Sequence, residues 1–258
     1  MLNGLDLFSG IGGLTIALRK WVRPIAYCEN DRYAQAVLLS RMWSGDIGRA
    51  AIWDDVRSLG GKMLDVPIDI IYGGFPCQDI SAAGVGIGLG GERSGLFHHI
   101  ARLVSETDPR FVFLENVPAI RTRGLNCVAQ TFTELGYDCR WTIVSAAEVG
   151  GPFIGKRWFF LAKANDKKQL EGLSAAANGE TLRQQSRRGG RQSGREENVH
   201  PSNGNAWPAS WTPERGFESR VFGTGDGIPF AVDRDRGLGN AVVPLQAKTA
   251  FMRLMGLI

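Results

Sequence analysis

Two residues that could do chemistry stand at the ends of apolar, strand-like segments. Cys77 lies in GGFPCQDIS, residues 73–81, and Glu115 lies in FLENV, residues 113–117. A thiol attacks carbon only when it is reachable and partly deprotonated, and a cysteine at a strand end meets the first condition. A neighbouring carboxyl group can move a proton on the attacked molecule. Together they suggest covalent catalysis, although a buried cysteine alone is more often inert and a lone glutamate more often caps a helix.

A glycine-rich turn follows the first apolar segment. In DLFSGIGG, residues 6–13, small residues would let a ligand approach backbone amides at the start of a helix. We therefore expect a nucleotide-like ligand at this strand end, although a tight turn without a ligand explains the glycines equally well. The spacing differs from G-x-G-x-x-G, which argues against an ordinary dinucleotide site.

Two acids follow the next strand-like segments. Glu29 ends the second segment, where a carboxylate can accept both hydroxyls of a ribose, and Asp55 in WDDV could accept from an adenine amino group. Each acid alone is more often a solvated loop residue. Three successive strand ends carry groups that suit a nucleotide-like ligand, and together they favour a ligand site.

The elements that must position these residues alternate along the chain. Apolar runs predict strands at residues 2–8, 24–28, 68–72 and 111–114, and amphipathic spacing predicts helices ending near Trp21 and at 31–43, 94–107 and 126–135. Alternation of this kind indicates a doubly wound α/β fold with a mostly parallel sheet. The runs at 137–146 and 156–164 predict a hairpin at the sheet edge, and a last helix ends the sequence.

The amino-acid composition changes between residues 164 and 208, which are rich in Gln, Ser, Asn, Gly and Arg. Such a segment is typical of a loop-rich or partly flexible insert. It contains five arginines without an acid between them: Arg183, Arg187, Arg188, Arg191 and Arg195. These could neutralise nucleic-acid phosphates, and a solvated linker is an equally good explanation.

Composition excludes several classes of protein. The 258 residues are 43% hydrophobic and 22% charged, with a net charge of +4, and no apolar run is long enough to span a membrane. The N-terminus lacks the pattern of a secretory signal, so we expect a cytoplasmic protein. Four cysteines without CxxC spacing and three histidines give no zinc ligand set, so we expect no metal.

Taken together, DLFSGIGG, Glu29, Asp55, GGFPCQDIS, ENV and GNAVVP resemble the ordered motifs of the DNA cytosine-5 methyltransferases. The resemblance covers residues 3–162 and 225–258. It implies a Rossmann-like methyltransferase fold with a small target-recognition lobe. The implied domains are a catalytic and cofactor-binding domain at 1–163, a basic, partly flexible recognition region at 164–224, and a segment at 225–258 that returns to the catalytic domain.

The same resemblance implies an S-adenosyl-L-methionine-dependent enzyme that methylates carbon 5 of a flipped-out cytosine in double-stranded DNA. Cys77 would add to carbon 6 of the cytosine, Glu115 would hold ring nitrogen 3 and the amino group, and Arg157 would contact the ring oxygen. The implied cofactor-binding residues are Phe8, Ser9, Gly10, Gly12, Glu29, Asn30, Asp55, Val56, Pro76, Leu96 and Asn240. We expect a monomer that acts in a bacterial or phage-infected cell, as restriction-modification methyltransferases do.

One segment departs from the family pattern. Where the family has a glutamine and two alternating arginines, this chain reads GPFIGKR, so Phe153 and Gly155 replace the first two and Arg157 matches the last. Two alternatives therefore stay open: a cytosine-5 methyltransferase of RNA, such as tRNA, and a catalytically impaired DNA-binding relative. The intact Cys77 and Glu115 argue against impairment. Amino-group methyltransferases are excluded because FPCQ does not fit their Asn/Asp-Pro-Pro-aromatic element.

Overall fold

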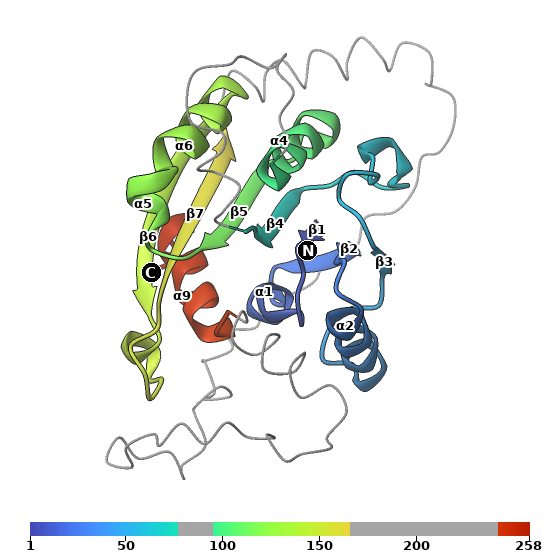
Figure 1. Cartoon of the computed structure of the whole chain (residues 1–258), viewed down its shortest axis with the longest axis horizontal. Helices are drawn as coiled ribbons and strands as arrows, with labels where there is room; N and C mark the ends of the chain where they lie inside the picture. The colour runs from blue at the N-terminus through green and yellow to red at the C-terminus, as the bar shows by residue number, and fades with distance from the viewer. Residues whose placement is uncertain (77–94, 166–241) are drawn as a thin grey trace, which may run out of the picture.

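A seven-stranded sheet forms the centre of the protein (Figure 1). The computed structural model describes residues 1–76, 95–165 and 242–258. The strand order is β3-β2-β1-β4-β5-β7-β6. The strands are β1 Leu2–Leu7, β2 Val22–Cys28, β3 Ala51–Trp53, β4 Ile70–Gly74, β5 Phe111–Asn116, β6 Tyr137–Ser145 and β7 Lys156–Ala164.

Five strands of the sheet are parallel, and the last two are not. β3, β2, β1, β4 and β5 pair in parallel, whereas β7 runs antiparallel to both β5 and β6. The order reverses between β1 and β4, and in sheets of this type ligands bind at the carboxyl ends of the strands beside such a point. The predicted doubly wound fold and the predicted edge hairpin are both confirmed.

The second strand begins earlier than its sequence suggests. We expected it to start at Pro24, where the second apolar run begins. In the structure β2 begins at Val22, and Pro24 pairs with Gly4 immediately before a register shift between Gly4 and Leu5. The irregularity lets the strand run past the proline.

Helices cover both faces of the sheet (Figure 1). The six α-helices of the described part are α1 Gly13–Leu18, α2 Arg32–Ser44, α4 Leu96–Thr107, α5 Ile120–Arg123, α6 Leu125–Glu134 and α9 Pro244–Met255, and short 3₁₀ turns are η1 Gly61–Met63 and η2 Ala147–Val149. Local sequence explains several boundaries. The Asp31 carboxylate caps α2 by accepting from the Ala34 N–H group at 2.9 Å, and Gly45 ends α2 in the left-handed conformation.

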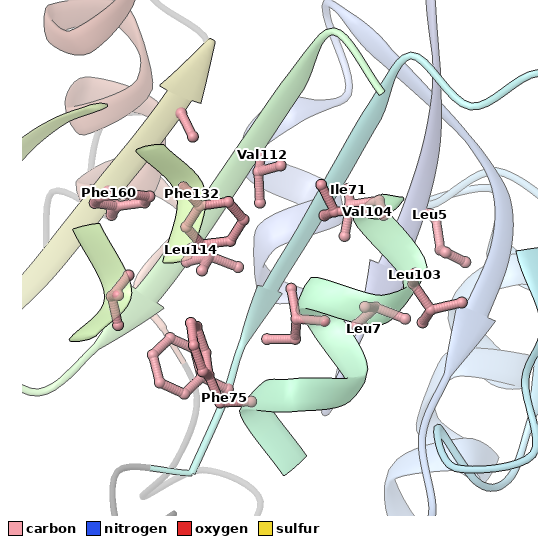
Figure 2. Close-up of a cluster of buried hydrophobic side chains, with 14 of the residues drawn as sticks. Leu5, Leu7, Ile71, Phe75, Leu103, Val104, Val112, Leu114, Phe132 and Phe160 are labelled. Atoms are coloured by element: carbon pink, nitrogen blue, oxygen red, sulfur yellow. The ribbon is translucent and has the colours of Figure 1, made fainter. Parts of the chain in front are cut away.

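The alternating strand residues form two large cores, and a smaller cluster of Tyr27, Leu38, Met42 and Ile47 joins β2 to α2. On one face α4 and α6 pack on side chains such as Leu5, Ile71 and Leu114, with Phe132 of α6 fully buried (Figure 2). On the other face α1 and α9 cover a second cluster that includes Phe251. Burial of this kind contributes about 1.5–3 kcal/mol for each large apolar side chain, so the two cores hold the strand ends in fixed positions.

Gly73 holds β1 and β4 together at the switch point. A Cβ atom at this position would overlap the carbonyl oxygen of Leu7, its partner on β1. We expect Gly73→Ala to lower the free energy of unfolding by about 3 kcal/mol, because strand backbones cannot separate without losing the ladder. Urea unfolding measures this. Gly60→Ala is the control, because its added Cβ would meet nothing closer than 3.9 Å, and equal stability of the two variants would contradict the argument.

Candidate active site at the carboxyl edge of the sheet

The turn after β1 has three residues in the left-handed conformation, two of them glycines. Phe8, Gly10 and Gly12 have positive φ angles of 54°, 52° and 83°, so the chain reverses sharply before α1. Among the described residues, a Cβ atom at Gly10 would meet no other atom within 4 Å, whereas one at Gly13 would lie 2.8 Å from Val242. Open space therefore remains over Gly10 on one side of the turn, while the helix packs tightly on the other.

The carboxylate of Glu29 closes this turn from β2. One oxygen accepts from the Gly10 N–H group at 2.6 Å, and the other accepts from the Asp31 N–H group at 2.8 Å. The residue is only 9% exposed, and each oxygen keeps a second lone pair. The carboxylate is thus fixed in position and can still accept two hydroxyl hydrogen bonds. Asn30, the next residue, is exposed.

A buried network lies beneath the turn. Thr15 of α1 donates its hydroxyl to Asp6 at 2.6 Å and lies 2.8 Å from the Tyr72 hydroxyl, so β1, α1 and β4 are joined. Ser9 adds a bond to the Asp6 carbonyl oxygen at 2.9 Å. Burial raises the pKa of Asp6 to about 8, which keeps this carboxyl group mostly protonated at neutral pH. The network therefore supports the turn without adding a buried charge.

Two further predicted cofactor residues follow β3. The Asp55 carboxylate pairs with Arg57 at 3.0 Å, and hydrogen bonds from the Arg57 side chain and backbone lower the pKa of Asp55. Val56 is buried, and its carbonyl oxygen accepts from Arg102 of α4 at 2.9 Å. Arg102 thus ties this loop to α4. Leu96, the first residue of α4, packs at the margin of the same core.

The acid predicted for catalysis is buried at the end of β5. Glu115 is 9% exposed, and its Oε1 lies 3.0 Å from the Nε of Arg157 on β7. Glu115 pairs with Gly74 of β4, and a Cβ atom at Gly74 would lie 2.7 Å from Oε2, so the missing side chain makes room for the carboxyl group. Burial raises the pKa of Glu115 to about 7, while the positive charge of Arg157 opposes this rise. Both protonation states are therefore accessible near neutral pH.

Two positioning side chains had no assigned role in the sequence. Asn116 donates to the carbonyl oxygen of Phe75 at 2.9 Å and so fixes the backbone just before Pro76. Gln246 of α9 is 1% exposed and donates to the carbonyl oxygens of Val144 at 3.0 Å and Gly155 at 2.6 Å. The ENV motif marks the first residue. No sequence motif indicates the role of Gln246, because its partners Val144 and Gly155 lie about a hundred residues away in the chain.

The structure thus places most of the predicted residues along one edge. Phe8, Ser9, Gly10, Gly12 and Glu29 form one connected group after β1 and β2. Pro76 follows β4, and Glu115 at the end of β5 contacts Arg157 of β7. Cys77 and Asn240 lie outside the described residues, as do residues 166–224 of the predicted recognition region and residues 225–241 of the predicted returning segment.

Within residues 1–76, 95–165 and 242–258, there is no group of three or more His, Cys, Asp or Glu side chains that could hold a metal ion. No helix in the same ranges has the length and apolar character needed to cross a bilayer.

The fold and these side chains define a class: a doubly wound α/β domain with a glycine-rich turn closed by Glu29 after β1 and a buried acid at the end of β5 that contacts an arginine of β7. The family model for C-5 cytosine-specific DNA methylase matches residues 2–247. The chain belongs to this family.

Relatives with assigned names agree with this membership. Type II methyltransferase M.CviJI from Paramecium bursaria Chlorella virus IL3A is 34% identical over 168 residues, which are 65% of this chain and 44% of the relative. Type II methyltransferase M.HhaI from Haemophilus parahaemolyticus is 32% identical over 170 residues, 64% of this chain and 50% of the relative. The chain spans about half the length of the curated relatives it matches.

Solved structures show the same fold. A crystal structure of a candidate DNA modification methyltransferase encoded within an E. coli prophage matches with a TM-score of 0.51 and 31% identity, covering 66% of this chain and 48% of that one. Dnmt2 of S. pombe matches with a TM-score of 0.51 at 22% identity, covering 64% and 51%, which supports the fold alone. The predicted fold class and family are therefore confirmed.

Proposed function

We propose that this protein transfers a methyl group from S-adenosyl-L-methionine to carbon 5 of a flipped-out cytosine in double-stranded DNA. The observation that carries the proposal is the contact between the buried Glu115 and the partly exposed Arg157, joined at 3.0 Å, at the sheet edge where the chain enters the Pro76–Cys77 sequence. A cytosine edge presents a ring nitrogen, an amino group and an oxygen. A carboxyl group with a pKa of about 7 can form hydrogen bonds with the first two, and a guanidinium group can donate to the oxygen.

The first strand ends fit the proposed cofactor. Open space over Gly10 leaves room for a ligand against the turn, and the free lone pairs of Glu29 suit the two hydroxyls of a ribose. The residues proposed to hold the cofactor are Phe8, Ser9, Gly10, Gly12, Glu29, Asn30, Asp55, Val56, Pro76, Leu96 and Asn240. S-adenosyl-L-methionine would supply the electrophilic methyl group that carbon 5 accepts.

Cys77 is proposed as the nucleophile. Its thiolate forms a bond to carbon 6, and the electron pair of the 5,6 double bond moves to carbon 5, which becomes nucleophilic. After methylation, carbon 5 loses its proton and the sulfur–carbon bond breaks, which restores the double bond and the free thiolate. Pro76 and the Phe75 carbonyl oxygen held by Asn116 fix the backbone that leads to this residue.

Glu115 and Arg157 are proposed to stabilise the charge that this addition creates. The protonated carboxyl group of Glu115 donates to ring nitrogen 3 as electrons enter the ring, and its other oxygen accepts from the amino group. Arg157 contacts Glu115 through Nε, so its terminal amino groups can donate to the ring oxygen. Burial of the Glu115 carboxyl group strengthens its bonds because little water competes with them, whereas Arg157 is partly exposed.

Incubation with radiolabelled S-adenosyl-L-methionine tests the proposal. Purified protein is given plasmid DNA, duplex RNA or transfer RNA, and sequencing of the methylated product locates the modified cytosines. We expect label in DNA only, at carbon 5 of cytosine within one sequence context. Label in RNA only would replace DNA as the substrate, and label in no polymer would favour a DNA-binding relative without activity.

The type II methyltransferases named above come from a virus and a bacterium. We propose the corresponding setting for this protein, with a monomer acting on DNA in the cytoplasm of a bacterial or phage-infected cell. Sedimentation with and without duplex DNA tests the oligomeric state, and a stable dimer would contradict it.

A further inference from the structure

The turn between β6 and β7 exposes two large apolar side chains next to the proposed site. Phe153 is 50% exposed and Ile154 is 69% exposed, and both precede Arg157 by only a few residues. This is the segment in which Phe153 and Gly155 stand where the family pattern has glutamine and arginine. An apolar side chain therefore stands at position 153, beside the proposed site for DNA, where the family pattern has a polar one.

This turn is held in one conformation. The Ala146 N–H group donates to the carbonyl oxygens of Ile154 at 3.0 Å and Gly155 at 3.2 Å, and Gln246 donates to Gly155 as well. The Gly151 N–H group donates to the Ala146 carbonyl oxygen at 2.7 Å. The exposure of Phe153 is thus a property of an ordered turn, so little conformational entropy is lost when a partner covers its ring.

Phe153 and Gly155 depend on each other. A Cβ atom at Gly155 would overlap Cε2 of the Phe153 ring and lie 2.6 Å from its Cδ2, and Gly155 has a φ angle of 23°. The ring therefore occupies the space where the first atoms of an arginine side chain would stand. In this conformation of Phe153, the absence of a side chain at Gly155 leaves room for the ring.

We propose that Phe153 stacks on a nucleobase that lies next to the cytosine held by Glu115 and Arg157. Extrusion of a base leaves its neighbours with exposed faces, and an aromatic ring covers such a face regardless of base identity. The ring lies on the turn that continues directly into Arg157, and the exposed Lys156 between them can pair with a phosphate group. This inference rests on the proposed function, since it assigns the surface around the same site.

The test measures binding apart from catalysis. The probe is a fluorescein-labelled DNA duplex with one central cytosine opposite an abasic site, which lowers the cost of extruding that cytosine. Anisotropy titrations at several salt concentrations compare wild type, Phe153→Ala and Phe153→Trp. We expect Phe153→Ala to weaken binding by roughly ten- to a hundredfold without changing its salt dependence, and Phe153→Trp to restore it.

Two further variants separate stacking from other effects. Leu39→Ala removes a side chain of equal exposure, 49%, from α2 and should bind as wild type does. Gly155→Ala should weaken binding by displacing the ring, yet it should add little in the Phe153→Ala background, because the two changes remove the same contact. Thermal unfolding of each variant confirms that the fold is retained.

The outcomes separate this inference from the proposed function. An unchanged dissociation constant for Phe153→Ala, or a changed salt slope, would overturn the stacking contact even if wild type methylates DNA. Weaker binding by Phe153→Ala in a protein that methylates no polymer would contradict the proposed function and support the contact.

Discussion

Replacement of Glu115 by glutamine is expected to lower kcat/KM for DNA methylation by about 10²–10⁴-fold, the range for loss of a positioned proton donor. Glutamine has nearly the shape of the protonated acid, so it fits over Gly74 and the sheet stays folded. It offers amide donors to the cytosine edge, but it cannot transfer a proton to ring nitrogen 3. Initial rates with radiolabelled S-adenosyl-L-methionine and plasmid DNA measure the loss.

The pH dependence of the same rates checks the reason. Burial raises the pKa of Glu115 to about 7, so the protonated form that donates to the ring is present below this pH and is lost above it. Wild-type kcat/KM should therefore contain an ionisation near pH 7 that lowers the rate as pH rises, and Glu115→Gln should lack it. A glutamine variant with wild-type activity, or with the same ionisation, would contradict the role of Glu115.

The second large effect is expected at the proposed nucleophile. Cys77→Ser should reduce methyl transfer by about 10⁴-fold or more, because a serine hydroxyl is hardly ionised at neutral pH and no base is assigned to activate it. Binding of S-adenosyl-L-methionine, measured by calorimetry, should stay close to wild type. Equal loss of binding and transfer would mean that Cys77 has a structural role.

A mechanism-based adduct and a second cysteine sharpen this experiment. DNA containing 5-fluorocytosine should form a complex with wild type that survives denaturant, because the blocked carbon 5 cannot release a proton, and Cys77→Ser should form none. Cys139→Ser is the matched control: burial raises the pKa of the Cys139 thiol to about 11, so it is not the attacking thiolate, and this variant should keep its activity. Activity without any adduct would contradict the covalent route.

The alternation of strands with helices and the residues at the strand ends could be predicted from the sequence, because both depend on local patterns. Glu29 and Glu115 end apolar runs, and parallel strands bring such ends to one edge of the sheet. The edge hairpin could also be predicted, since its two apolar runs are separated by a turn-rich segment.

The contacts that hold the site could not be predicted, because they join residues far apart in the chain. The pairing of Arg157 with Glu115 depends on the antiparallel register in which Glu115 faces Phe159. The bonds from Gln246 to Gly155 depend on where α9 packs. Periodicity says which face a residue occupies, but it does not say which distant residue meets it there.

The placement of α9 has a consequence for how such a protein can change. β7 ends at Ala164 and α9 begins at Pro244, and both belong to the same body, in which α9 contacts β6 and β7. The chain between them leaves and re-enters one scaffold whose ends are already fixed, and the entropy of closing such a connection grows only with the logarithm of its length, about 0.6 kcal/mol for each doubling. Changes in the number of residues between Ala164 and Pro244 should therefore cost little free energy of folding, while the strands and helices that carry Glu29, Glu115 and Arg157 stay as they are.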